Sequence, residues 1–306
     1  MTQYNVHKVS VCIPTYNYGR FIADAIESVL AQTFSDYELI ISDNCSDDNT
    51  RHIVEKYTIS DSRIRYYCNE QNIGMVGNWN RCLELAQGEY VKILCADDLL
   101  EPICLEESVN ALECYTNAVL VSGARLLVDT HLKPVAKHSF GDSLQVVLGT
   151  DVIQRCLVEG NLIGEPTSVL FRRALAVRGF DTAYQQITDM EMWFHILENG
   201  YFAFVPDVIC RYRQHEDQET QTNRKSLSIV EDQFTLYGGY LEKPYVKYGF
   251  LEREEILFNV AFHAWSQRIL GVDLKSVIRC IARHFGLMKF FVLLALKTLK
   301  RRFSAS

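Results

Sequence analysis

Residues 90–98 read Tyr-Val-Lys-Ile-Leu-Cys-Ala-Asp-Asp, a β-prone apolar run that ends in two adjacent carboxylates. Gly88 precedes this run and Pro102 follows it, which predicts a short buried parallel strand that opens into a loop at its carboxyl end. In open α/β sheets, ligands bind at that end of the strands. Because neighbouring carboxylates repel each other, Asp97 and Asp98 need a compensating positive charge, which a divalent cation bridging to a phosphate would supply. Alternatively, one aspartate caps the next helix and the other is solvated.

Strands and amphipathic helices alternate on the N-terminal side of this run, and the chain is helical towards its end. The helix predicted from Phe21 to Ala31 carries its apolar side chains on one face, as a helix packed on a sheet does. Such alternation is typical of a parallel, doubly wound sheet. We predict an α/β fold with a Rossmann-like, mostly parallel central sheet flanked by helices and a C-terminal helical extension. The predicted strands cover residues 9–13, 38–42, 64–67, 90–94, 118–122, 201–205 and 208–212.

Composition excludes several classes of function. The chain has 306 residues, 48% hydrophobic and 23% charged, as in an ordinary globular protein. Its formal net charge of −7 argues against a nucleic-acid partner, because phosphate contacts need a basic surface. The ten cysteines form no CxxC pair, and Cys12 and Cys95 lie within apolar strands, so we expect a reducing cytosol. We also expect no signal peptide and no membrane-spanning segment.

Familiar nucleotide and cation motifs are absent from the sequence. Neither GxGxxG nor GxxxxGK[ST] occurs, which argues against a dinucleotide-binding turn and a phosphate loop. The acidic run 43–50 lacks the glycine of an EF-hand, and Val54 stands where that motif needs a bidentate glutamate. The aspartates at 97 and 98 must therefore be interpreted together with other segments.

Several short polar segments follow the predicted strands or begin predicted helices. In this order they resemble the family-2 glycosyltransferases, the large inverting group with the GT-A fold, over roughly residues 8–215. Asn44 and Cys45 differ from that family, which usually has Asp and Gly at these positions. The segments that carry the resemblance are Val11–Asn17, Asp43–Asp48, Asn72 with Gly74, Gly88–Tyr90, Asp97–Asp98, Thr188–Asp189 and Arg211–His215.

The resemblance implies a site for a nucleotide-diphosphate sugar and a divalent ion, Mn²⁺ or Mg²⁺. Asp98 would bind the ion between the two phosphates, and His215 would be a further ligand, which favours Mn²⁺ because imidazole suits it better. Otherwise His215 is an ordinary exposed loop histidine. The residues implied to bind the nucleotide sugar are Pro14, Thr15, Tyr16, Asn17, Asp43, Ser46, Asn72, Gly74 and Asp97.

Asp189 is implied to be the catalytic base. An acceptor hydroxyl must lose its proton as it attacks the anomeric carbon, and a carboxylate placed there contributes roughly 10²- to 10⁴-fold. One direct displacement inverts configuration and needs no second nucleophilic carboxylate. The alternative is that Asp189 is the N-cap of the helix that follows it, and the two roles are compatible.

The segment His284–Phe303 is apolar with a basic end and contains no acidic residue. An apolar helix of this kind, too short to span, is typical of an element drawn to the surface of an anionic membrane. The competing interpretation is a helix that packs on the catalytic domain or on a second subunit. A lipid-linked acceptor would favour the membrane.

The resemblance implies a metal-dependent inverting glycosyltransferase of bacterial surface-polysaccharide assembly. It would be cytoplasmic, on the inner face of the membrane when bound there, and its acceptor a glycan or lipid-linked oligosaccharide. We expect a catalytic domain over 1–220, with a nucleotide-sugar half at about 8–125 and an acceptor half at about 126–220, and a helical region over 221–306. The alternatives are a sugar-nucleotide nucleotidyltransferase and a non-catalytic carbohydrate-binding module. The oligomeric state stays open.

Overall fold

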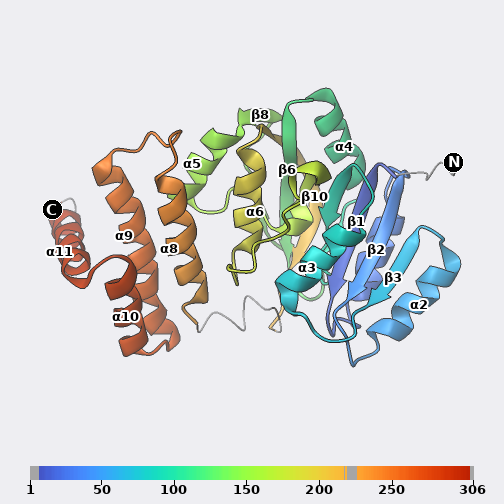
Figure 1. Cartoon of the computed structure of the whole chain (residues 1–306), viewed down its shortest axis with the longest axis horizontal. Helices are drawn as coiled ribbons and strands as arrows, with labels where there is room; N and C mark the ends of the chain where they lie inside the picture. The colour runs from blue at the N-terminus through green and yellow to red at the C-terminus, as the bar shows by residue number, and fades with distance from the viewer. Residues whose placement is uncertain (1–6, 217, 219–225, 304–306) are drawn as a thin grey trace. The chain divides into compact units, whose positions relative to one another are not determined.

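Figure 1 shows a computed structural model of the chain, which describes residues 7–216, 218 and 226–303, and the side chains up to residue 297. The chain divides into two compact units. The first comprises Met1–Ala183 and Thr188–His215, and the second comprises Tyr184–Ile187 and Glu216–Ser306. The domain boundary expected at residues 220/221 lies outside the described residues.

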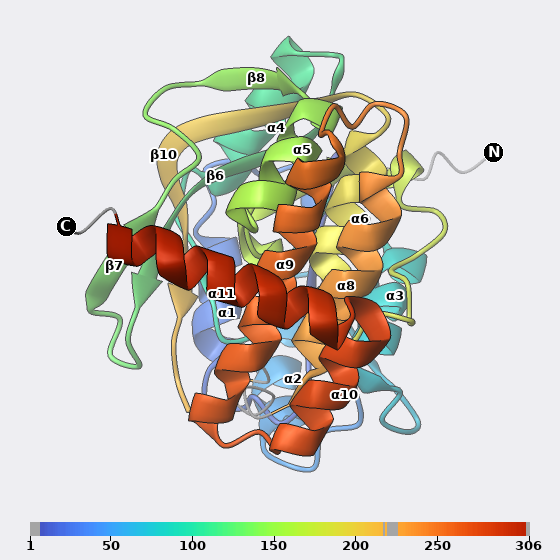
Figure 2. The same ribbon diagram turned by 90° about the vertical axis from the view of Figure 1, so that its left-hand side faces the viewer.

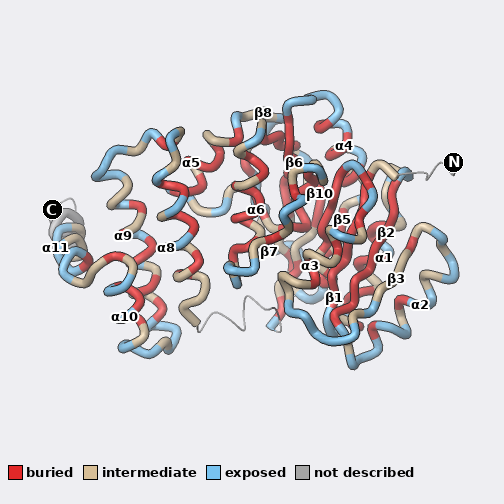
Figure 3. The backbone as a smooth tube through the Cα atoms, in the orientation of Figure 1, coloured by how far each residue is buried: buried red, intermediate tan, exposed pale blue. Residues whose placement is uncertain are grey.

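The first half of the first unit is a parallel sheet. Its strands lie in the order β3-β2-β1-β4, and parallel pairing sets Thr15 opposite Asp43 at their carboxyl ends. Strands β1, β2 and β4 are buried along their whole length, as expected for strands covered on both faces, and Figure 3 shows β1 and β2 in red. The edge strand β3 is only partly buried. The strands are β1 (Val9–Thr15), β2 (Tyr37–Asp43), β3 (Ile64–Cys68) and β4 (Tyr90–Ile93). The connecting helices are α1 (Ile22–Leu30), α2 (Thr50–Ser60) and α3 (Gly74–Leu85).

The second half of this unit extends the same sheet with mixed pairing. Strand β9 (Val169–Arg172) runs antiparallel between β4 and β6 (Ala118–Val128), and β10 (Tyr201–Arg213) runs parallel to β6. The predicted α/β fold with flanking helices is confirmed. The remaining strands are β5 (Leu99–Leu100), β7 (Pro134–His138) and β8 (Gln145–Leu148). The helices are α4 (Cys104–Cys114), α5 (Gly149–Glu159) and α6 (Thr188–Leu197), with the short turns η1 (Pro166–Ser168) and η2 (Arg173–Leu175).

The prediction of two short strands at 201–205 and 208–212 was wrong. They are one strand, β10, whose register against β6 shifts between Val205 and Val208 and again between Val208 and Cys210. Pro206 has no N–H to donate, so the hydrogen bonding between β10 and β6 is interrupted at this residue and continues beyond a register shift. In the sequence, such an interruption resembles the end of a strand. The continuous strand carries Arg213 to the edge of the sheet where β4 ends.

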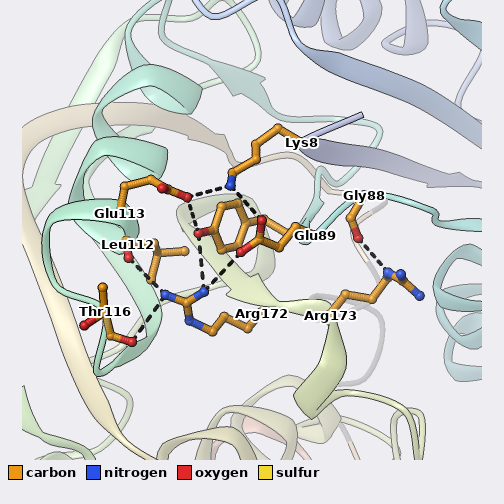
Figure 4. Close-up of polar contacts among 9 residues, drawn as sticks. Lys8, Gly88, Glu89, Leu112, Glu113, Thr116, Arg172 and Arg173 are labelled. Atoms are coloured by element: carbon orange, nitrogen blue, oxygen red, sulfur yellow. Dashed lines mark hydrogen bonds and ion pairs between the residues drawn. The ribbon is translucent and has the colours of Figure 1, made fainter. Parts of the chain in front are cut away.

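At the opposite edge, where the strands begin, an ion-pair network joins four segments (Figure 4). Lys8 Nζ lies 2.6 Å from Glu89 and 2.7 Å from Glu113, and Arg172 lies 3.3 Å from Glu89. Glu113 and Glu89 accept hydrogen bonds from Lys8 and thereby raise its pKa. Because these side chains are partly exposed, each pair contributes only about 0–1 kcal/mol. The network links the starts of β1 and β4 to α4 and leaves the other edge free for a ligand.

The second unit is helical. Figure 2 shows α11 lying crosswise over α9, where the rings of Phe258 and Phe290 are 5.7 Å apart and Lys297 donates to Asn259. Within the described part of the chain, every helix is too short or too polar to cross a bilayer. The helices are α8 (Ser228–Leu241), α9 (Phe250–Ser266), α10 (Leu274–His284) and α11 (Leu287–Phe303), with the turn η3 (Gln267–Leu270).

Candidate active site

The loops that follow β1 and β2 are bound to each other at the carboxyl edge of the sheet. Asn44 N–H donates to the carbonyl of Thr15 (2.8 Å), and Asn17 N–H donates to Ser46 Oγ (2.8 Å). In the reverse direction, Asp47 N–H donates to Asn17 Oδ1 (2.9 Å). The segments predicted to bind the nucleotide sugar, 14–17 and 43–46, therefore form one surface.

Two polar groups in this surface bear on ligand binding. Asp43 is fully buried and accepts hydrogen bonds from Ser46 N–H (2.9 Å) and from the Tyr66 hydroxyl (2.6 Å). The Thr15 hydroxyl is buried and has no hydrogen-bond partner within the described residues. A buried hydroxyl without a partner is unfavourable, and a bound ligand would satisfy it.

Asn44 connects this surface to the loop after β3. Its side-chain N–H₂ donates to Asn72 Oδ1 (2.8 Å) and to the carbonyl of Gly74 (3.2 Å), and its Oδ1 accepts from Ile73 N–H (2.9 Å). Gly74 has φ of 77°, a value that favours glycine. The asparagine that departs from the family pattern thus holds predicted residues 72 and 74 beside Asp43. The sequence did not indicate this role.

Asp98 is fully buried after β4, and both of its carboxylate oxygens accept hydrogen bonds. The Thr167 hydroxyl donates to Oδ2 (2.6 Å), and the backbone N–H of Arg213 donates to Oδ1 (2.9 Å). Burial raises the pKa of Asp98 well above its ordinary range, and the charge of Asp97 raises it further. A bound cation would have the opposite effect by stabilising the ionised form.

The residues around Asp98 fit a divalent ion. Cys95, Asp97 and Asp98 each offer one ligand atom, and these atoms lie within 4.8 Å of one another. Carboxylate oxygens are the ligands that Mg²⁺ and Mn²⁺ prefer. The two adjacent buried carboxylates, whose mutual repulsion is unfavourable without a cation, are therefore the part of this group best suited to hold the ion.

His215 is buried beside Asp97, so the interpretation of an exposed loop histidine was wrong. Its Nε2 lies 3.0 Å from Asp97 Oδ2, and its Nδ1 lies 3.3 Å from Arg20. The ring also packs against Phe21, with 4.7 Å between the ring centroids. The histidine therefore contacts the first of the two aspartates directly.

Asp189 is the second residue of α6 and so is not its N-cap, which corrects the structural alternative for this residue. Burial raises its pKa from 3.8 to about 7, and the charge of Glu165 also acts to raise it, against the lowering effect of a hydrogen bond from the backbone of Met190. The residue nevertheless keeps partial solvent exposure. It is a carboxyl group that can exchange a proton near neutral pH with a group arriving from solution.

The structure brings Asp189 into the electrostatic neighbourhood of the aspartate pair. Burial raises the pKa of the Cys95 thiol, and the charges of Asp98, Asp97 and Asp189 raise it further. Trp193, one turn along α6 from Asp189, donates to the carbonyl of Gly164 (3.2 Å) and so ties this helix to the turn that precedes Thr167. Residues distant in the sequence thus surround one place at the sheet edge.

Sequence reasoning missed three residues of this neighbourhood, and it gave no specific role to a fourth, Tyr212 of the segment Arg211–His215. Thr167 binds Asp98, and Glu165 forms an ion pair with the buried Arg125 while its charge acts on both Asp98 and Asp189. Burial raises the pKa of Tyr212, and Asp98 is the largest charge acting on it. The family-like segments found in the sequence do not include Gly164–Thr167. Its Glu-Pro-Thr sequence, polar and directly before a strand, was the available signal.

Comparison with protein families and relatives agrees with this geometry. The glycosyl transferase family 2 profile matches residues 10–179. The putative teichuronic acid biosynthesis glycosyltransferase TuaG of Bacillus subtilis is 42% identical over 215 residues, covering 67% of this chain and 78% of TuaG. The UDP-Glc:alpha-D-GlcNAc-diphosphoundecaprenol beta-1,3-glucosyltransferase WfgD of Escherichia coli is 28% identical over 262 residues, covering 85% of this chain and 96% of WfgD.

Solved structures share the fold. Residues 1–349 of TarS from S. aureus, solved with UDP-GlcNAc, match with a TM-score of 0.67 at 20% identity, covering 90% of this chain and 80% of that chain. The mannosyltransferase PcManGT from Pyrobaculum calidifontis, solved with GDP-Man and Mn²⁺, matches with a TM-score of 0.58 at 17% identity, covering 96% and 80%. The chain is therefore a transferase that belongs to glycosyl transferase family 2 and has the GT-A fold.

Proposed function

We propose that this enzyme transfers a sugar from a nucleotide-diphosphate sugar to a hydroxyl of a glycan or lipid-linked glycan, with inversion, in the assembly of a bacterial surface polysaccharide. The observation that carries the proposal is the shared neighbourhood of Asp97, Asp98 and Asp189 at the carboxyl edge of the sheet. Family membership already sets aside the two alternatives, a nucleotidyltransferase and a non-catalytic module.

The donor would bind on the surface formed by the loops after β1, β2 and β3. Thr15 and Asp43 would contact the nucleoside, since the Thr15 hydroxyl is buried without a partner within the described residues. Asp97 would lie near the ribose or the transferred sugar. The other residues assigned to the donor are Pro14, Tyr16, Asn17, Ser46, Asn72 and Gly74.

Asp98 would hold Mn²⁺ or Mg²⁺. His215 would be a further ligand, since it contacts Asp97, the neighbour of Asp98. When bound, the ion neutralises the charge that develops on the departing diphosphate. Thr167 and the Arg213 backbone would orient the Asp98 carboxylate for this task, as hydrogen-bond donors behind a metal ligand commonly do.

Asp189 would accept the proton of the attacking hydroxyl. A general base works best when its pKa lies near the operating pH, and the pKa of about 7 at Asp189 satisfies this condition. Because one displacement at the anomeric carbon inverts its configuration, a single base is sufficient.

Helix α11 would bind the enzyme to a membrane surface, where the enzyme would reach its lipid-linked acceptor. Met288, Phe291, Val292 and Leu296 are 84%, 43%, 53% and 52% exposed, and their spacing places them on one face of the helix. Lys289 and Lys297 pair with Glu254 and Glu255 of α9. The apolar stripe would therefore be the main contact with the membrane, and the basic residues 300–302 would add attraction to anionic lipid.

The replacement Asp189→Asn tests the chemistry. We expect turnover to fall roughly 10²- to 10⁴-fold, because the amide cannot accept the proton. A thermal-shift screen with UDP-, GDP- and dTDP-sugars, each with and without Mn²⁺, should show the same donor-induced stabilisation in this variant as in the wild type. Undiminished turnover would remove Asp189 from this role.

Sedimentation with anionic vesicles tests the membrane surface. We expect a triple variant, Met288→Ser with Phe291→Ser and Leu296→Ser, to lose pelleting, because apolar area drives interfacial binding. Ile59→Ser is the control, because it alters an apolar side chain of the first unit that is at least as exposed as the three altered residues of α11. Equal pelleting of the triple variant and the control would favour packing against protein.

A further inference from the structure

Three metal-ligating side chains come together in the second unit, away from the residues assigned to catalysis. Glu231 lies in the first turn of α8, and Cys280 and His284 lie on α10. Cys280 and His284 are four residues apart, which places them on the same face of their helix. One ligand atom from each residue lies within 4.8 Å of the other two.

The surroundings favour binding over simple packing. The His284 ring stacks on Phe234 with 5.0 Å between centroids and 8° between planes, which fixes the orientation of its nitrogens. Cys280 is buried, while Glu231 and His284 are partly exposed, so an ion can enter from solvent. Arg283 lies 3.9 Å from Glu231, but their side chains are 63% and 47% exposed, and a pair at such exposure is weak.

We propose that Glu231, Cys280 and His284 bind a transition-metal ion, Zn²⁺ being the best match, and that this ion ties α10 to α8. Thiolate, imidazole and carboxylate are the three donor types that zinc uses, and water would fill the fourth position. In a tetrahedral site with bonds of about 2.0–2.3 Å the ligand atoms lie roughly 3.3–3.8 Å apart, so side-chain rotations that shorten the present separations by about 1 Å bring the three atoms into range. Mg²⁺ and Ca²⁺ are poor candidates because they prefer oxygen ligands.

Cobalt titration of the full-length protein tests this proposal, since Co²⁺ occupies zinc sites and gives a thiolate-to-metal absorption band. We expect the band in the wild type, its loss in Cys280→Ser, and at least roughly tenfold weaker binding in His284→Gln. Zn²⁺ alone should raise the melting temperature of the wild type and abolish the cobalt band by displacement.

Two cysteine variants separate this site from the rest of the chain. Cys95 belongs to the catalytic group, so Cys95→Ser must retain the band, as must Cys114→Ser, which alters an exposed cysteine. If Cys280→Ser fails to fold, Glu231→Gln and His284→Gln, both at partly exposed positions, test the same site, and each should weaken cobalt binding.

A band that survives in Cys280→Ser and vanishes in Cys95→Ser, or a zinc-induced thermal shift equal in wild type and His284→Gln, would overturn the proposal. Because the site shares no residue with the proposed catalytic group, its failure would leave the proposed transfer reaction unaffected. Loss of turnover in Asp189→Asn would likewise say nothing about the zinc site.

Discussion

At Asp189, burial changes the pH range over which the carboxyl group is ionised, and so makes its contribution to stability depend on pH. Its pKa of about 7, raised mainly by burial, means that the folded protein holds a proton at pH values where an unfolded chain, with an ordinary pKa of 3.8, has released it. Protonation therefore favours the folded state, and the contribution of this carboxyl to stability falls as pH rises from about 4 to about 7.

This pKa predicts opposite pH effects on rate and stability. We expect kcat to rise with pH up to about 7, about tenfold per unit below it, because the base must be ionised. Asp189→Asn should lose most of its turnover, yet be more stable than the wild type at pH 8 by about 1 kcal/mol or more. Rate profiles and chemical denaturation at pH 5 and pH 8 measure both, and equal stability of the two proteins at pH 8 would contradict the raised pKa.

Cys45 gives a second prediction at the residue scale. Its φ of 66° lies in the left-handed region, where a residue with a Cβ is strained by roughly 1–2 kcal/mol. Cys45→Gly should therefore raise the free energy of unfolding by about 0.5–1 kcal/mol, after the greater flexibility of unfolded glycine is allowed for.

Cys114→Gly is the matched control, because this exposed cysteine lies in a helix at negative φ and its replacement should destabilise the protein. Denaturant unfolding of both variants makes the comparison. A destabilised Cys45→Gly would show that the side chain contributes more than its backbone strain removes.

The sequence allowed candidate site residues to be named where they belong to a motif. It did not indicate residues that reach the same neighbourhood only because distant segments fold together. Asp97, Asp98 and Asp189 stood out because they stand in segments that resemble family motifs, although helix capping was an ordinary alternative for an aspartate at such positions. Glu165 and Thr167 did not, since their importance depends on Trp193 fixing the turn against α6. Such long-range pairing has no local signal.

At the scale of elements, the turn η1 positions Asp98. It presents the Thr167 hydroxyl, which donates to Asp98 and accepts from the backbone N–H of Cys95 (3.2 Å). Thr167→Val keeps the shape and removes both bonds. We expect Mn²⁺ affinity to fall roughly 10- to 100-fold, as when a metal ligand loses its orienting partner.

Activity and melting temperature as functions of Mn²⁺ concentration measure this effect. Thr116→Val, at an exposed position, is the control and should behave as the wild type. An unchanged Mn²⁺ dependence in Thr167→Val would mean that Asp98 needs no orienting hydroxyl.

Gly88 gives a prediction about the joining of β1 and β4. A Cβ at Gly88 would lie 2.6 Å from Ser10 N and 2.8 Å from the backbone carbon of Val9, and backbone atoms cannot move aside. Gly88→Ala should lower the free energy of unfolding by about 2 kcal/mol or more. Gly238→Ala, in α8 with open space around it, should instead stabilise the protein by up to about 1 kcal/mol. Thermal unfolding distinguishes them, and similar shifts in both would contradict the close approach.

Elements were predicted best where burial is uniform. Strands β1, β2 and β4 matched because continuous apolar runs mark strands that are covered on both faces of a sheet. The mixed half was harder, since β7 is mostly exposed, β8 has only four residues, and β10 contains Pro206 at its irregularity. Pairing with distant strands, rather than local preference, creates these elements.

At the scale of the whole molecule, the second unit includes four residues from the middle of the chain, Tyr184–Ile187. Asp232 Oδ2 accepts hydrogen bonds from the backbone N–H groups of Gln185 (2.8 Å), Gln186 (2.7 Å) and Ile187 (3.4 Å). Helix α6 begins at the next residue, so Asp232 anchors the segment that leads directly to Asp189.

Asp232→Ala should therefore affect both stability and catalysis. Leaving these N–H groups without an acceptor is expected to lower the free energy of unfolding by about 1–3 kcal/mol. We also expect kcat to fall while the KM for the donor stays the same, because the start of α6 loosens. Asp232→Asn, which retains a carbonyl oxygen, should recover much of both, and failure of this rescue would argue against anchoring. Steady-state kinetics with denaturant unfolding measures these effects.

The interleaving of Tyr184–Ile187 with the second unit limits how the enzyme can be re-engineered. In a chimera that exchanges only the sequence after His215 for that of a relative, the new helices would lack the segment Tyr184–Ile187 with which the native helices form one unit. A working chimera should take residues 184–187 from the same relative as the helices, or keep an acidic residue at position 232.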